Sequence, residues 1–130
     1  MKKKDRQIIF DKYRGKCAYC GCELLKGWHA DHIDPILRDS KWNREKGRFE
    51  KTGTCRNPKN ETLENYNPAC VSCNVQKNSF TIEQFRSNIK QFVHSLNQYS
   101  TQYKFAKRYG LVKETNIEVK FYFETFNPDC

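Results

Sequence analysis

The chain has 130 residues, the size of one domain, and its 24 Lys and Arg against 15 Asp and Glu give a formal net charge of +9. No apolar run approaches the length of a membrane span, which indicates a soluble protein without a membrane partner. The basic residues are spread along the chain, and this favours a polyanionic partner, nucleic acid first. A basic surface that serves only solubility is the alternative.

The N-terminus and the cysteines bear on the compartment. Residues 1–4 are followed by Asp5, Arg6 and Gln7 rather than by a long apolar segment, so a secretory signal is not expected. In the reducing cytoplasm that this predicts, four of the seven cysteines fall into two Cys-x-x-Cys pairs. That usage indicates metal binding rather than disulfides.

A short helix is predicted over residues 5–14, with Asp5 as its cap and Gly15 at its end. The first cysteine pair follows it, and Gly21 supplies the backbone freedom that a tight turn around two thiolates requires. Cys22 in place of Cys20 as a metal ligand is a less favoured alternative.

The segment 28–36 alternates in the manner of a strand, and Pro35 is expected to stop it. Residues 38–62 hold many basic and few apolar residues. We predict that they form a long loop or insertion, of the kind that is either functional or mobile. Cys55 lies within it and is expected to be a bystander.

A capping box of Thr81 and Gln84 predicts the start of a helix after the second cysteine pair. Apolar residues recurring every three or four positions predict its buried face: Ile82, Phe85, Ile89, Phe92, Val93 and Leu96. His94 beside them favours a structural role over a catalytic one. A second helix over 100–109 should end at Gly110, and the alternation from Ile117 to Glu124 predicts a half-buried C-terminal strand.

Four thiolates, from Cys17, Cys20, Cys70 and Cys73, would form a closed tetrahedral zinc site, which is structural rather than catalytic. Zinc contributes about 10–16 kcal/mol in small zinc domains, whereas whole domains are stable by only about 5–15 kcal/mol. We therefore expect the fold to depend on the metal. Two redox dithiols or four buried cysteines are the alternative.

The candidates for chemistry are Asp31, His32, Asn65 and Asn74. Asp31 and His32 are neighbours in a strand and point to opposite faces, which suits a carboxylate on a hard cation and an imidazole acting on water. Asn74 directly follows the last cysteine, so zinc would fix its position, and its amide oxygen suits Mg²⁺ or Mn²⁺. Alternatively, Asp31 is a surface cap or ion pair and both asparagines are turn residues.

Taken in this order, the motifs resemble those of the HNH nucleases of the ββα-metal fold. The matching positions are Cys17-x-x-Cys20, Ala30-Asp31-His32-Ile33-x-Pro35, Asn65 and Cys70-x-x-Cys73-Asn74-x-x-Lys77. The resemblance covers residues 17–80. It departs at the third letter of the family's name, where Asn74 replaces histidine but keeps an oxygen ligand.

The resemblance implies that His32 is the general base that activates water against a phosphodiester. It implies that Asp31 and Asn74 hold one divalent cation, Mg²⁺ or Mn²⁺, and that Asn65 braces the loop and orients His32. Phosphate contacts would come from Lys77, Arg38, Lys41 and Arg44. His29 is a weaker candidate, for a metal or for a phosphate.

We therefore expect a single α+β domain over residues 1–130. Its zinc-stabilised ββα-metal core would span about 15–80, with flanking helices, and a helical extension over about 81–130 would end in a strand. The expected function is a metal-dependent endonuclease on DNA, with RNA as an alternative substrate, in the cytoplasm of a bacterium or a phage-infected host cell. A homodimer would suit double-strand cutting. The alternative from another class is a non-catalytic zinc module that binds nucleic acid by charge.

Overall fold

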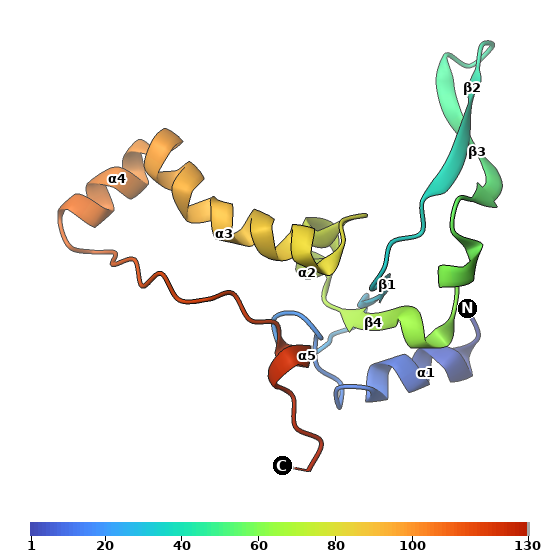
Figure 1. Cartoon of the computed structure of the whole chain (residues 1–130), viewed down its shortest axis with the longest axis horizontal. Helices are drawn as coiled ribbons and strands as arrows, with labels where there is room; N and C mark the ends of the chain where they lie inside the picture. The colour runs from blue at the N-terminus through green and yellow to red at the C-terminus, as the bar shows by residue number, and fades with distance from the viewer. Residues whose placement is uncertain (130) are drawn as a thin grey trace.

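The computed structural model describes residues 1–129, which form a small mixed α+β domain with two separate two-stranded sheets. In chain order the elements are α1 (Lys3–Asp11), β1 (His29–His32), β2 (Arg38–Asn43), β3 (Arg48–Cys55), β4 (Tyr66–Ala69), α2 (Val71–Lys77), α3 (Ile82–Tyr99), α4 (Thr101–Arg108) and α5 (Tyr122–Thr125). Figure 1 shows a central body from which the β2–β3 hairpin and the α3–α4 pair project in different directions.

The central body is built on the pairing of β1 with β4, which are antiparallel and place Asp31 opposite Asn67 and His32 opposite Tyr66. Helix α2 starts directly after β4 and packs on both strands. Cys70 caps this helix, since its Sγ accepts a hydrogen bond from the Cys73 backbone at 3.4 Å. The strands β1 and β4 and helix α2 therefore form one unit, and Cys70 caps its helix.

Helix α1 lies against β4 and is held there by Lys12. The Lys12 ammonium donates to the Tyr66 carbonyl at 2.9 Å and to the Asn67 amide oxygen at 3.0 Å. The helix starts at Lys3, and Lys2 caps it without a side-chain hydrogen bond. The predicted cap at Asp5 is therefore wrong. Asp5 lies in the first turn, where a carboxylate interacts favourably with the helix dipole.

The predicted loop over residues 38–62 is wrong in its first two thirds, where β2 and β3 pair as an antiparallel hairpin. Trp42 and Phe49 lie directly opposite each other with ring centroids 5.1 Å apart. Asn57 fixes the base of the hairpin, accepting from the Leu37 backbone at 3.0 Å and donating to the Pro35 carbonyl at 2.5 Å. A four-residue turn without the Asn-Gly or Asp-Gly signal of tight hairpins hid this element.

The largest buried cluster surrounds Tyr19, whose ring lies edge-on to Phe85 and Phe121 at centroid distances of 5.7 and 5.6 Å. Cys17 and Ala69 are also buried in it, so the apolar core and the cysteines of the first turn are one structure. A core of this size favours a domain that relies on additional cross-linking.

The predicted capping box of Thr81 and Gln84 is present at the start of α3. The predicted buried face is confirmed only in the first half of the helix, where Phe85 is buried and Ile82 and Ile89 pack on the core. The later residues are exposed: Phe92, Val93 and Leu96. The reason is length, because an 18-residue helix spans about 27 Å and extends past the central body.

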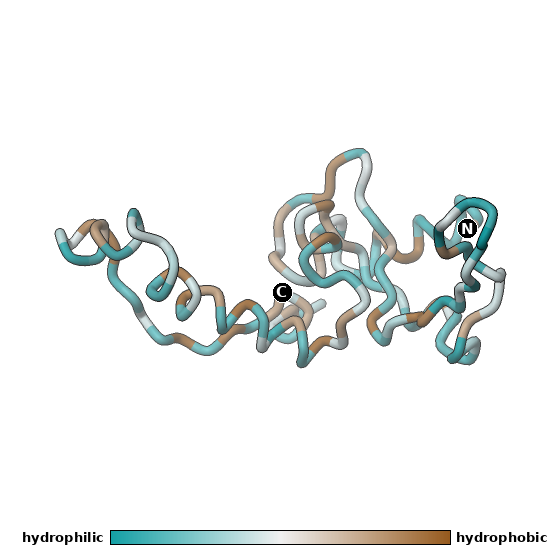
Figure 2. The backbone as a smooth tube through the Cα atoms, turned by 90° about the horizontal axis from the view of Figure 1, so that it is seen from above, coloured by the Kyte–Doolittle hydropathy of each residue, from teal (hydrophilic) through white to brown (hydrophobic). Residues whose placement is uncertain are grey.

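The α3–α4 pair carries apolar positions along its length, as Figure 2 shows. Helix α4 follows the prediction closely and ends before Gly110, whose φ of +76° permits the Leu111 amide to bond back to the Ala106 carbonyl at 2.8 Å. Among residues 1–129, no helix is both long and apolar enough to cross a bilayer.

The predicted C-terminal strand is wrong. Residues 112–121 form neither a helix nor a strand in the part of the chain described, Asn116 among them has a φ of +53°, and α5 follows. The alternation matches side-chain burial at Val119, Phe121 and Phe123, which pack on the core, but not at Ile117, which is 79% exposed. The backbone bonds instead to the first cysteine turn, from Phe123 N to the Ala18 carbonyl at 2.8 Å. A period of two identifies the buried side chains but not the backbone's partner.

Phe121 should therefore contribute strongly to stability although it lies in no strand. We expect Phe121→Ala to lower the free energy of unfolding by about 3–5 kcal/mol, since it removes a buried ring between Tyr19 and Phe85. Urea unfolding followed by circular dichroism measures this. Ile117→Ala, in the same segment, is the control and should change stability by less than about 0.5 kcal/mol. Equal losses in both variants would contradict this packing.

Candidate metal centre and active site

The four cysteines predicted to bind zinc lie together. The Sγ atoms of Cys17, Cys20, Cys70 and Cys73 are all within 4.8 Å of one another, and Cys20 and Cys70 are 3.8 Å apart. Zn–S bonds of about 2.3 Å in a tetrahedron place sulfurs about 3.8 Å from each other. The donor set and its spacing therefore fit one structural metal ion.

The ionisation of these thiols is linked. A hydrogen bond from Cys73 lowers the pKa of the Cys17 thiol to about 4, and the same bond raises the pKa of the Cys73 thiol. Thiols this close cannot all ionise without a cation to balance them. A bound metal would release the remaining protons and take four thiolates.

Backbone hydrogen bonds shape the first cysteine turn. The Cys17 amide donates to the Cys22 carbonyl at 2.8 Å, and the Gly21 amide donates to the Cys17 carbonyl at 3.0 Å. Gly21 has a φ of +77°, and a Cβ there would lie 2.9 Å from the Tyr122 ring. The Ala18 amide donates to the Pro68 carbonyl at 2.8 Å. This last bond joins the turn to β4 and hence to the second cysteine pair.

The alternative ligand Cys22 contacts Cys20 and Cys70 through its thiol but is not one of the four clustered sulfurs, and neither is Cys55. Cys22 is exposed, and Cys55 is the last residue of β3. The arrangement favours the predicted ligand set over the one with Cys22.

Asp31 is buried in a network that sequence reasoning did not foresee. The Tyr19 hydroxyl donates to Asp31 Oδ2 at 2.5 Å, and the Lys77 ammonium lies 3.1 Å from the same oxygen. Burial raises the pKa of Asp31, while the Tyr19 hydrogen bond and the Lys77 charge lower it. Burial and the neighbouring carboxylate raise the pKa of Tyr19, so its hydroxyl keeps its proton and remains a donor.

Lys77 differs from its prediction as a phosphate contact. Its side chain is fully buried, and its ammonium also donates to the His32 carbonyl at 2.7 Å. Helix α2 presents this position to β1, so the long side chain points into the body rather than toward solvent. Lys77 is therefore a buried partner of Asp31, and it offers no exposed charge to a phosphate.

His32 is the last residue of β1, and its side chain is 18% exposed. Its Nε2 lies 2.9 Å from Glu61 Oε2, and its ring lies 4.5 Å from the Tyr66 ring. The Tyr66 hydroxyl donates to the other oxygen of Glu61. This hydrogen bond, followed by the contact with His32, lowers the pKa of Glu61. Glu61 is therefore ionised at neutral pH and accepts a hydrogen bond from His32 Nε2.

Sequence reasoning missed Glu61 and Tyr66 as neighbours of His32. Glu61 is 29 residues away in sequence and follows the β2–β3 hairpin. Tyr66 lies opposite His32 because of the β1–β4 register. The one available signal for Tyr66 was its position directly after Asn65, and no spacing pointed to Glu61.

Asn65 acts on the backbone beyond β1. Its amide oxygen accepts from the Asp34 backbone at 2.9 Å, and its amide nitrogen donates to the carbonyls of Asp34 at 2.9 Å and Asn60 at 2.8 Å. Asn65 therefore braces the loop that follows His32, while the imidazole itself is held by Glu61.

Asn74 lies three residues before Lys77 on α2, so both share the side of the helix that faces β1. The Asn74 side chain makes no hydrogen bond within residues 1–129. Asp31 Oδ2 is occupied by two donors, which leaves Oδ1 as the oxygen open to another ligand. The donors on offer, a carboxylate oxygen and an amide oxygen, suit a hard divalent cation.

The remaining predicted positions are exposed. Arg38, Lys41 and Arg44 all belong to the β2–β3 hairpin, where they face solvent. His29 opens β1 on the surface, and His94 is exposed on α3. Lys41 and Arg44 therefore stand on the projecting hairpin, whereas Arg38, at its start, lies near enough to Glu61 for its charge to help lower the pKa of that carboxyl.

Cys70→Ser is expected to lose the metal and the folded state together. The metal would join the two cysteine pairs, and the core is packed between them. Metal content by mass spectrometry and folding by circular dichroism test this. Cys22→Ser is the matched control, and we expect it to keep one zinc per chain and a normal spectrum. A Cys70→Ser protein that stays folded without metal would falsify the structural role.

Lys77→Met is expected to lower the free energy of unfolding by about 3–5 kcal/mol, since it leaves the Asp31 carboxylate buried without its cation. Urea unfolding of the zinc-loaded protein gives this quantity. Lys90→Met, at an exposed position on α3, should cost less than about 0.5 kcal/mol. A loss below about 1 kcal/mol for Lys77→Met would refute the buried pair.

Comparison with known protein families, with curated proteins and with solved structures finds no match to this chain. The resemblance to the HNH nucleases therefore rests on the motif residues of the sequence.

Proposed function

We propose that this chain is a metal-dependent endonuclease of the HNH type that hydrolyses phosphodiester bonds in DNA. The observation that carries the proposal is the meeting of three motif residues on one ββα unit. Asp31 and His32 end β1, and Asn74 lies on α2 directly after the last cysteine. The metal centre beside them would hold all three in place.

His32 is the proposed general base. With Glu61 ionised, Nε2 carries the proton of the neutral imidazole and donates a hydrogen bond to Oε2, so Nδ1 keeps its lone pair. Nδ1 can then take a proton from a water molecule as that water attacks phosphorus. The contact with Tyr66 and the bond from Lys77 to the His32 carbonyl restrict the ring and its backbone. Such fixed geometry supports general base catalysis.

Asp31 and Asn74 are the proposed ligands of a divalent cation, through their free side-chain oxygens. When bound, the cation would stabilise charge on the phosphate and on the leaving oxygen. Tyr19 and Lys77 hold the other Asp31 oxygen and so fix the carboxylate's orientation. Departure of the 3′ oxygen would leave 5′-phosphate and 3′-hydroxyl ends.

A zinc module that binds nucleic acid without cutting it is the second candidate. The Asp31–Lys77 pair favours it, because a carboxylate already neutralised by an ammonium gains less from binding a cation. The net charge of +9 supports nucleic-acid binding in both candidates. Only cleavage separates them.

His32→Ala is expected to lower the rate of plasmid cleavage by about 10²- to 10⁴-fold, the usual contribution of a general base. Nicking of supercoiled plasmid is measured with and without added Mg²⁺ or Mn²⁺, alongside zinc content and DNA affinity, which should stay unchanged. His94→Ala, at an exposed histidine on α3, is the control and should cut normally.

Glu61→Gln sharpens the same test. It keeps the size of the side chain but removes the charge that orients His32 Nε2, and we expect kcat to fall by about 10- to 100-fold with little change in KM. Full cleavage by His32→Ala would overturn the assignment of the base. Folded, zinc-loaded wild type that cuts no DNA form with either cation would favour the binding module.

A further inference from the structure

The tip of the β2–β3 hairpin exposes two aromatic rings. Trp42 is 52% exposed and Phe49 is 67% exposed, although the two rings contact each other edge-on. No residue of either strand is buried, so the hairpin packs no face against the body. These rings therefore serve no core, and each keeps an open face toward solvent.

Positive charge surrounds this aromatic pair. Residues 38–56 hold seven Lys and Arg against three Asp and Glu. Lys46 and Arg48 lie near Glu50 at 3.1 and 3.7 Å, and Arg56 lies 3.7 Å from Asp39. The remaining cations nearest the rings have no ion-pair partner within residues 1–129: Lys41, Arg44 and Lys51.

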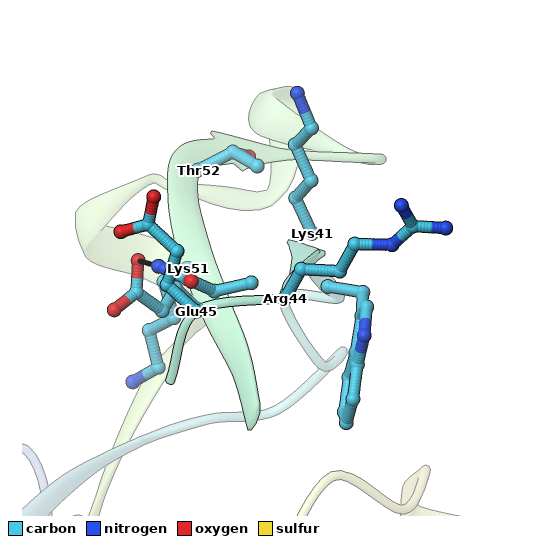
Figure 3. A pocket seen from close by; sticks show the side chains of 8 residues that line it. Lys41, Arg44, Glu45, Lys51 and Thr52 are labelled. Atoms are coloured by element: carbon cyan, nitrogen blue, oxygen red, sulfur yellow. Dashed lines mark hydrogen bonds between the residues drawn. The ribbon is translucent and has the colours of Figure 1, made fainter. Parts of the chain in front are cut away.

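Lys41 and Lys51 lie on opposite faces of the hairpin, and Arg44 opens its turn. Lys51 shares a face of the hairpin with Phe49, two residues along β3. Lys41, Arg44 and Lys51 line an open hollow of about 560 Å³ that Trp42 also borders, and the carboxylates on it are Glu45 and Glu50. Figure 3 shows the Lys41 and Arg44 side chains extending away from the ribbon. Aromatic faces among unpaired cations are the combination that single-stranded nucleic acids bind, through base stacking and phosphate attraction.

We propose that the hairpin tip is a binding site for unpaired nucleotides, with Trp42 and Phe49 stacking on bases and the three free cations holding phosphates. This inference rests on the proposed function and gives its substrate class, DNA that contains a single-stranded or unpaired segment. Bases in a duplex are stacked on each other and offer their faces to no side chain, whereas unpaired bases do.

The hairpin reaches well beyond the catalytic residues. Its base is clamped by Asn57 next to the β1 loop, and Trp42 lies five residues beyond Leu37, about 17 Å of extended strand. The tip would therefore bind the strand several nucleotides away from the phosphodiester that the water activated by His32 would attack.

The chain has two tryptophans, Trp28 and Trp42, which gives a direct test. In the Trp28→Phe protein, Trp42 is the single reporter, and an oligothymidylate of about twelve nucleotides should quench its emission by stacking. In the Trp42→Phe protein, Trp28 reports from its site against Phe10, and its emission should not change. A duplex of equal length, at the same salt, should leave Trp42 emission nearly unchanged.

Affinity for the labelled oligothymidylate gives the second readout, by fluorescence anisotropy without added Mg²⁺ or Mn²⁺. Trp42→Ala is expected to weaken binding by about 5- to 150-fold. Phe105→Ala, at an exposed ring on α4, is the matched control and should bind like wild type.

Oligothymidylate that binds without changing Trp42 emission would overturn the stacking site, and so would equal quenching by the duplex or the absence of binding. No step of these measurements requires cleavage. Quenching by a protein that cuts no DNA would therefore remove the nuclease and keep the binding site.

Discussion

The clustering of four thiols is the constraint on which the rest of the structure depends. It joins a turn near the N-terminus to the junction of β4 and α2, some fifty residues later. Apolar burial alone is modest, and its central cluster includes Cys17 and packs against Cys70 and Cys73. Because the core is assembled around the sulfurs, a metal there would stabilise the core and the two cysteine turns at once.

The same constraint sets the electrostatics of the candidate site. Tyr19 lies between the two cysteines of the first turn, and Lys77 lies on the helix that the second pair begins. Both side chains converge on one oxygen of Asp31. A buried carboxylate is tolerated only where such partners are held in place. Asp31 is therefore linked to the cysteine cluster by Tyr19, within the first cysteine pair, and by Lys77, on the helix that follows the second pair.

Residues that act locally could be predicted from the sequence, and residues that act through distant contacts could not. The cysteine spacing correctly predicted that two distant segments of the chain meet, and the Thr81 capping box correctly predicted where α3 begins. Lys77 was misplaced because its motif position says nothing of which way the side chain points. Phe121 was assigned to a strand because alternation records burial but not pairing. Glu61 carried no local signal, since only the folded chain brings it to His32, 29 residues away.

The path of the chain links the hairpin to the imidazole. After His32 the chain runs through Pro35 into β2, returns along β3, and passes Asn57 before it reaches Glu61. Asn57 holds the start and end of the hairpin together. The position of Glu61, four residues after Asn57, therefore depends on where these two ends of the hairpin lie. A ligand that displaced the hairpin base would therefore also shift the carboxylate that holds His32 Nε2. The proposed nucleotide site on the hairpin and the proposed general base, His32, are thus connected through one short segment of backbone, which a longer or looser connection would not provide.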